Sequence, residues 1–299
     1  MRRAAFPMQN LAAGSMKSDA VRGALYLLIG EFFLALMVAL IKLLSPDTSQ
    51  IAMVFFRNLF GLLALLPLIA HKRIATLKTE RFGMHFFRAC TGVTGMYLYF
   101  YVIGHMPMAE AVLVRLSVAF ILPILTWLWL RERITLRTFL SILLGFVGVT
   151  FILRPGTEAF QPIALIGLLA AVFQGESVVA IRKMSLTEPG HRIVFYFGLI
   201  ATGISAIPFF LFTPTYPSGD TLYYLIGIGI TATLGQLFIT EAYKIANPGQ
   251  IGLYTYSCVI YAAAIGWLFW DETLLLSTLI GTALIITAGL VNLKRPTTK

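Results

Sequence analysis

The sequence predicts an all-α integral membrane protein whose ten transmembrane helices form two inverted five-helix repeats. Three observations support this fold class: the composition, an internal repeat, and the placement of Lys and Arg between apolar segments. Of the 299 residues, 58% are hydrophobic and 12% are charged, whereas ordinary soluble domains carry about 25% charged residues. The apolar runs are continuous rather than alternating, which indicates spanning helices and not a β-barrel.

The internal repeat is clearest where each half of the chain ends. Residues 122–155 align with residues 262–296 when Glu132 is placed on Glu272, an offset of 140 residues. The same alignment superposes Trp127 on Trp267, Thr138 on Thr278, Leu153 on Leu293 and Arg154 on Lys294. A repeat of membrane-length segments is typical of transporters built from two halves.

A spanning helix needs about 20 mostly apolar residues, and the chain has room for ten such helices joined by short loops. The expected spans are 22–44, 50–70, 83–105, 107–130, 135–154, 162–182, 191–213, 221–245, 248–270 and 274–293. Gly, Pro and polar residues typical of turns bound them, as at Ser45-Pro46-Asp47, His105-Met106-Pro107, Pro155-Gly156, Thr213-Pro214 and Asn247-Pro248-Gly249. The first repeat is expected at 21–155 and the second at 156–296, after a disordered basic tail at 1–20.

The basic residues between the spans predict the orientation in the membrane. They collect at both termini and in the even-numbered loops, whereas the opposite side carries only Lys42 and Arg154. Because Lys and Arg accumulate on the cytoplasmic side, both termini are predicted to be cytoplasmic and the protein to lie in the inner (plasma) membrane. Five crossings per repeat is an odd number, so the second half must enter from the opposite side and the repeats are inverted. The net charge of +10 is explained by this topology, and no nucleic-acid partner is expected.

Several short runs resemble the EamA domain of the drug/metabolite transporter superfamily. They are Phe55-Phe56-Arg57 with Leu65-Leu66-Pro67, Tyr97 to Tyr101, Met106 to Ala111, Pro123 and Trp127 to Arg133, and, more loosely in the second half, Gln236, Ala242-Tyr243, Pro248, Trp267 and Glu272. Two such repeats cover about residues 22–294. The resemblance implies a central substrate cavity, alternating access and varied cargo, including amino acids, nucleotide-related metabolites, sugars and drugs. One departure is that Arg131 and Asp271 precede the repeated glutamates, where the family usually has Gly.

Charged residues inside the spans are the main candidates for a substrate site. Glu31, Arg57, Arg88, Arg115 and Glu176 lie within predicted helices, and each costs about 2.5–3.5 kcal/mol at the centre of a spanning helix. Arg88 is near enough to the cytoplasmic end to extend to the headgroups. For Arg57 and Arg115 two interpretations stay open. One is a permanent ion pair with Glu31 or Glu176, and the other is a guanidinium that binds a carboxylate or phosphate of the substrate.

Glu31 and Glu176 occupy the first helix of each half and are near-equivalent by the repeat. Either carboxylate could load and release a proton, or bind an amine, so we expect proton coupling at one of them. Among the remaining polar and aromatic residues, Tyr101, Tyr254 and Gln236 are predicted to contribute to the substrate cavity.

The sequence therefore predicts a secondary-active transporter of a small amphipathic metabolite with an acidic group, such as an amino acid, with export favoured over uptake. The alternatives are an uptake carrier for a nucleotide-related or other anionic metabolite, a lipid-modifying membrane enzyme, and a non-transporting membrane protein. The chain has no nucleotide-binding glycine loop, zinc motif or nucleophile elbow, so no enzyme, cofactor or metal is expected. Cys90 and Cys258 lie in apolar segments and predict neither a disulfide nor a metal cluster. The expected partners are the substrate and the lipid bilayer, and a homodimer is left open.

Overall fold

A computed structural model describes residues 8–70, 78–131, 134–153, 162–184, 187–213, 217, 219–246 and 251–293. Over these residues the protein is helical and contains no strand. The first half consists of α1 (Met8–Leu44), α2 (Gln50–Ala70), α3 (Phe82–His105), α4 (Met108–Leu116), α5 (Val118–Leu130) and α6 (Leu136–Leu153). The second half consists of α7 (Ile163–Met184), α8 (Gly190–Phe212), α9 (Asp220–Ile245), the 3₁₀ helix η2 (Gly252–Tyr256), α11 (Ser257–Trp270) and α12 (Leu276–Leu293).

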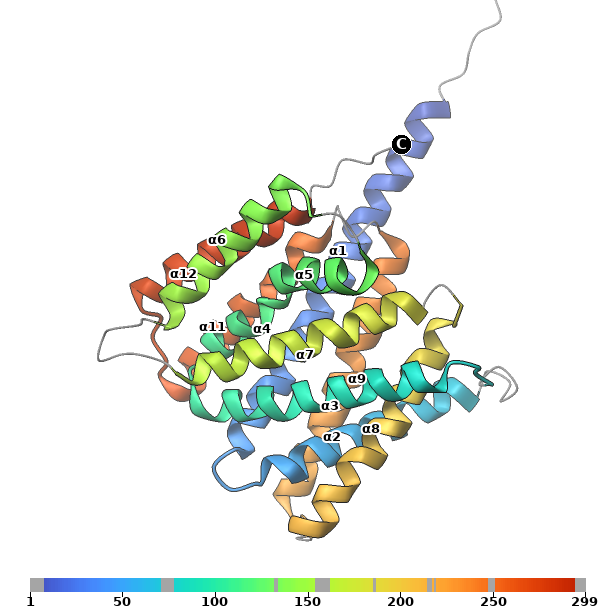
Figure 1. Cartoon of the computed structure of the whole chain (residues 1–299), viewed down its shortest axis with the longest axis vertical. Coiled ribbons are helices and arrows are strands. Elements are labelled where there is room, and N and C mark those ends of the chain that lie inside the picture. Colours follow the sequence, from blue (N-terminus) through green and yellow to red (C-terminus); the bar gives the residue numbers. More distant parts are fainter. Residues whose placement is uncertain are drawn as a thin grey trace, which may run out of the picture.

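The predicted all-α membrane fold is confirmed. In the described part of the chain, six helical segments are long and apolar enough to cross a membrane, and α6 and α12 contain shorter apolar helices. Counting α4 with α5 and η2 with α11 as single spans gives ten segments over these residues. The predicted tail differs from the structure, because α1 begins at Met8 and residues 8–20 continue the first helix (Figure 1). Residues 8–13 contain Met, Gln, Leu and Ala, which favour a helix, and residues 1–7 lie outside the described part.

The two halves pack on each other helix by helix. The α1–α9 contact and the α3–α7 contact are equivalent by the repeat, whereas α2–α8 and α6–α12 each join a helix to its own counterpart. The α4–α11 contact joins the fourth span to the ninth, which is its counterpart. Figure 1 places α6 and α12 at one end of the bundle, α2 and α8 at the other, and α4 and α11 between them. A two-fold axis through these three pairs runs across the helices. It therefore lies in the membrane plane, as inverted repeats require.

Glycines let the backbones touch where helices of the two halves cross. A Cβ on Gly30 of α1 or on Gly235 of α9 would lie 3.1 Å from the carbonyl oxygen of the other residue. At the α6–α12 crossing, a Cβ on Gly281 would lie 2.7 Å from the carbonyl oxygen of Gly148. Such close approach drives helix association in lipid, where hydrophobic burial gives little preference for protein over lipid.

The fourth and ninth spans are broken at equivalent positions, although the sequence predicts each as one continuous helix. Ser117 separates α4 from α5, and Ser257, its counterpart at an offset of 140 residues, follows η2 and begins α11. The backbone N–H of Ser117 donates to the carbonyl of Val114 at 3.1 Å, which is the tighter 3₁₀ pattern. Ser117 ends α4 and Ser257 begins α11, so both breaks adjoin helices that pack against each other.

The repeated acidic turns have a structural role. Arg131 and Asp271 end α5 and α11 in the left-handed conformation, with φ of 56° and 51°. This conformation favours glycine, which explains the usual glycine of the resembling family. After Asp271, the carboxylate of Glu272 accepts a hydrogen bond from the backbone N–H of Met108 at 2.7 Å and pairs with Lys42. Glu272 thereby ties α1 and the start of α4 to the end of α11, while Glu132 lies outside the described residues.

The glycine contacts predict a position-specific loss of stability. Gly281→Ala should lower the free energy of unfolding by about 1–3 kcal/mol, because the added methyl must push α12 away from α6. The matched control is Gly203→Ala in α8, where a Cβ would meet nothing within 4 Å. Thermal unfolding of the purified proteins in detergent measures both. Equal effects of the two substitutions would contradict the close packing of α6 and α12.

Candidate functional site

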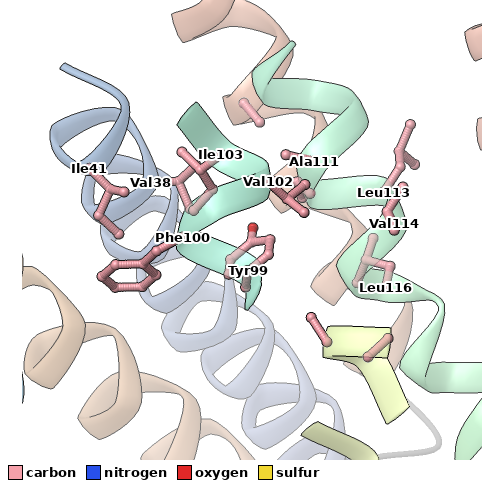
Figure 2. Packing of buried hydrophobic residues seen from close by; sticks show 14 of the residues in the cluster. Val38, Ile41, Tyr99, Phe100, Val102, Ile103, Ala111, Leu113, Val114 and Leu116 are labelled. Carbon is pink, nitrogen blue, oxygen red and sulfur yellow. The ribbon is translucent and has the colours of Figure 1, made fainter. Parts of the chain in front are cut away.

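The candidate site is positioned by the apolar packing of α1, α3 and α4. Figure 2 shows Phe100 and Ile103 of α3 beside Val38 and Ile41 of α1. Phe100, Ile103 and Ile41 are fully buried, so these helices have little freedom to rotate. Tyr99, the next residue on α3, is also buried and lies between the apolar side chains (Figure 2). This packing holds the polar groups of the three helices in fixed positions.

Glu31 and Arg115 form an ion pair inside the bundle. An Nη2–Oε2 distance of 4.0 Å joins Arg115 of α4 to Glu31 of α1, and Glu31 is only 3% exposed. The guanidinium of Arg115 lies over the ring of Tyr99, 5.9 Å from its centre. The structure therefore brings Glu31 together with Arg115, the arrangement that the ion-pair interpretation predicts for Arg115.

Several buried polar atoms of this pair, of Tyr99 and of the two helix breaks have no hydrogen-bond partner in the described part of the protein. They are Glu31 Oε2, Arg115 Nε, the Tyr99 hydroxyl, Ser117 Oγ and Ser257 Oγ. Each such group costs about 1–3 kcal/mol when left unsatisfied. They come from α1, α3, α4 and the two helix breaks, and they supply a carboxylate, a guanidinium and three hydroxyls. Together they can bind a small polar molecule that carries both a donor and an acidic group.

Arg57 and Arg88 have a different environment from Arg115. In the described chain neither forms an ion pair with a carboxylate. Arg57 Nη1 donates to Asn58 Oδ1 at 2.9 Å, and Asn58 Nδ2 donates to Ser205 Oγ at 3.4 Å. Arg88 does not extend to the headgroups, which was one interpretation of its sequence position. It is buried against α8 and donates to the carbonyl of Ile193 at 2.8 Å.

The structure does not bring the other four predicted residues into contact with the Glu31–Arg115 pair. Glu176 is partly exposed on α7 and forms no ion pair with a described residue, and Gln236 is exposed on α9. Tyr101 is exposed and stacks on His105, with ring centres 4.2 Å apart. Tyr254 is exposed in η2. Their part in substrate binding stays a prediction.

Sequence reasoning missed Tyr99, Ser117 and Ser257. Tyr99 belongs to the run of alternating tyrosines, but the sequence alone does not tell which tyrosine faces α4. Ser117 and Ser257 are equivalent by the repeat, so aligning the fourth and ninth spans would have identified them.

Hollows on the protein surface do not coincide with these buried groups. One lies beside Trp267 and Glu272, and another is lined by Leu136, Leu140 and Val291 where α6 meets α12. Neither is lined by Glu31 or Arg115, although the Arg115 side chain is 24% exposed.

A second polar cluster, near the start of α3, is a structural link. Glu188 accepts hydrogen bonds from Thr79 at 2.7 Å and from Arg192 at 3.0 Å, and lies 3.6 Å from His85 Nε2. Burial alone would raise the pKa of Glu188, but the hydrogen bonds and the charge of Arg192 lower it. The carboxylate therefore stays ionised and joins the loops before α3 and α8.

Known proteins resemble this chain along nearly its whole length. Residues 21–154 and 161–293 each match the EamA-like transporter family. The pseudopaline exporter CntI of Pseudomonas aeruginosa is 31% identical over 268 residues, covering 89% of the chain and 94% of that protein. The S-adenosylmethionine uptake transporter of Rickettsia felis is 28% identical over 267 residues, covering 88% and 90%. The riboflavin transporter of Vibrio cholerae is 25% identical over 264 residues, covering 85% and 87%.

The fold also matches a protein of solved crystal structure. The two structures agree with a TM-score of 0.62 at 18% identity, over 92% of this chain and 96% of the other. At this identity the match concerns the fold alone.

The Glu31–Arg115 pair predicts non-additive effects on stability. Arg115→Gln should cost about 3–5 kcal/mol, because it leaves the buried Glu31 carboxylate without its cation. The double variant with Glu31→Gln should be more stable than the sum of the single effects implies. Arg22→Gln, at an exposed position of α1, is the control and should change little. The coupling is obtained from the unfolding, in detergent, of the wild type, the single variants Arg115→Gln and Glu31→Gln, and the double variant. Additive effects of the two substitutions would contradict the pairing.

Proposed function

The chain belongs to the EamA-like transporter family, and we propose that it is a secondary-active carrier of a small amphipathic metabolite with an acidic group, such as an amino acid or a related compound. The family and the named relatives are transporters and not enzymes. The names of those relatives cover different metabolites and both an exporter and an uptake carrier. The substrate class must therefore be argued from the residues of this chain.

The buried polar cluster around Arg115 is the observation that carries the proposal. The guanidinium of Arg115 lies 4.0 Å from the Glu31 carboxylate, and its Nε has no hydrogen-bond partner among the described residues. A carboxylate on the substrate could bind this fork in a bidentate manner. An amine on the same molecule could then bind Glu31, which favours a zwitterionic or amphipathic metabolite.

The mechanism that we propose is alternating access, in which the interlocked halves rock about the central cluster. The energy comes from an ion gradient or from exchange, with Glu31 or Glu176 as the residue that binds and releases a proton. Export is the favoured direction, and the 31% identity to the pseudopaline exporter supports it. Uptake, as in the S-adenosylmethionine relative, is the alternative.

Transport by the purified protein in sealed vesicles tests this function. Wild-type protein should show saturable counterflow of at least one acidic metabolite from a panel of amino acids and related compounds. An imposed proton gradient should increase its net flux. The double variant Glu31→Gln, Glu176→Gln should lose the response to the gradient, while Gly203→Ala should keep it. A double variant with the wild-type response would exclude proton coupling at these residues, and inertness of the wild type across the panel would contradict the carrier function.

The proposed topology places both termini in the cytoplasm of a cell with the protein in its inner membrane. A C-terminal fusion to green fluorescent protein should fluoresce, and a C-terminal fusion to alkaline phosphatase should be inactive. Fusions in the loop between α1 and α2, after Asp47, should give the opposite result. An active phosphatase fused to the C-terminus would show that the C-terminus lies outside the cytoplasm and would contradict the proposed orientation.

A further inference from the structure

We propose that Lys42 and Glu272 form a latch that holds the outer side of the carrier closed, and that the latch must break before the substrate site can open to that side. The latch consists of these two side chains and of the backbone of the turn between α3 and α4, which both of them contact. Lys42 lies in the last turn of α1, at the end of the bundle opposite the N-terminus. The inference rests on the proposed function for alternating access and for the assignment of this side as the outer one.

Lys42 joins the end of α1 to two other elements. Its ammonium pairs with the carboxylate of Glu272 and donates to the carbonyl oxygen of Met106 at 3.1 Å. It also lies 5.6 Å from the ring centre of Trp270, the last residue of α11. The side chain of Lys42 is 14% exposed and that of Glu272 is 16% exposed, so both charges are largely shielded from water. Shielding makes this pair stronger than an ion pair on an open surface.

Glu272 is held in place by α4 and α11. Its Oε2 accepts a hydrogen bond at 2.7 Å from the backbone N–H of Met108, the first residue of α4. Its own backbone N–H donates to the carbonyl of Gly266 at 3.2 Å, and a Cβ on Gly266 would lie 2.5 Å from the same carboxylate oxygen. The carboxylate therefore lies at the start of α4 and the ammonium at the end of α1, which are the helix ends that favour a negative and a positive charge.

The contact joins the two repeats at the ends of three helices. The end of α1 and the start of α4 belong to the first half, whereas α11 belongs to the second and packs against both. Glu31, Arg115 and Ser257 lie deeper on the same three helices. A route from the outer side to these groups passes between the helix ends that the latch joins. Opening this side therefore requires the contacts of Glu272 with Lys42 and α4 to be lost.

The repeat has no equivalent ion pair at Lys183 among the described residues. Lys183 follows Lys42 by 141 residues and lies in the last turn of α7, which is on the cytoplasmic side in the proposed topology. It is exposed and pairs with no carboxylate in the described part of the chain. Alternating access closes one side of a carrier while the other opens. A contact that is made at Lys42 and not at its counterpart is therefore expected to change with the state of the carrier.

Thiol labelling of Cys258 from each side of the membrane tests the latch. Cys258 is 1% exposed in the first turn of α11, and separation of α11 from α1 and α4 would expose it. Cys90→Ala removes the other cysteine and provides the parent protein. In right-side-out vesicles, Lys42→Gln and Glu272→Gln should each react with a membrane-impermeant maleimide at least about fivefold faster than the parent, because they remove a charge-assisted contact. In inside-out vesicles they should react no faster than the parent.

Asp271→Asn is the matched control. Asp271 is the exposed neighbour of Glu272 with a left-handed backbone, a conformation that asparagine also tolerates. This variant should react at the rate of the parent from both sides. The proposal is overturned if neither latch variant reacts faster from the outer side, or if the control reacts as fast as they do. An equal gain from both sides also overturns it, because a merely loosened fold gives that result. If one latch variant does not fold, the other decides the question alone.

The labelling experiment needs no substrate, so it separates the latch from the carrier function. Counterflow by the wild type, together with unchanged labelling of Lys42→Gln and Glu272→Gln, would remove the latch and leave the carrier function intact. An outer-side gain in labelling, in a protein that carries no metabolite of the panel, would leave the latch and remove the carrier function.

Discussion

Backbone contact between the two repeats is the constraint on which the rest of the structure depends. In lipid, apolar side chains gain little by leaving the bilayer for a neighbouring helix, so association relies on close packing. Gly30 against Gly235 and Gly148 against Gly281 supply that packing at two crossings. Each contact joins one half to the other, so neither repeat can complete its own core. The interlocked pairs then position α1, α3 and α4, and with them Glu31, Arg88 and Arg115.

The packing follows the two-fold symmetry, whereas the charges do not. A Cβ on Gly95 would lie 3.3 Å from the carbonyl oxygen of Ala170, as one on Gly235 would lie 3.1 Å from that of Gly30. The offset of 140 residues that relates these two contacts makes Ala171 the structural counterpart of Glu31. The same offset of 140 residues makes Thr255 the counterpart of Arg115. The ion pair therefore exists only once in the molecule. The packing frame is therefore repeated in the two halves, whereas the charged residues inside it are not.

Much of the fold could be predicted from the sequence, because hydropathy and the placement of basic residues are each read over many residues, so that no single residue decides the result. Spans are set by hydropathy over many residues, and the inversion follows from an odd number of crossings and the placement of Lys and Arg. The helix breaks at Ser117 and Ser257 could not be predicted in this way, since apolar residues continue on both sides of each. The pairing of Glu31 with Arg115, and not with Arg57, depends on the rotation of each helix. That rotation is decided by packing such as that of Phe100 and Ile103.

The charged residues of the spans are also unevenly distributed along the two-fold axis. Glu31, Arg57, Arg88, Arg115 and Glu176 lie on α1, α2, α3, α4 and α7, and beyond the first turn of α6 neither α6 nor α12 carries a charge in its described residues. The α6–α12 pair, at one end of the bundle (Figure 1), is joined instead by glycine contacts and by the hydrogen bond from Ser141 to the carbonyl of Ala288. Glu110, buried on α4, accepts a hydrogen bond from Thr278 of α12 at 2.6 Å, so the carboxylate at this pair comes from the central helices and not from α6 or α12. The two arginines without a carboxylate partner among the described residues, Arg57 and Arg88, lie instead on α2 and α3.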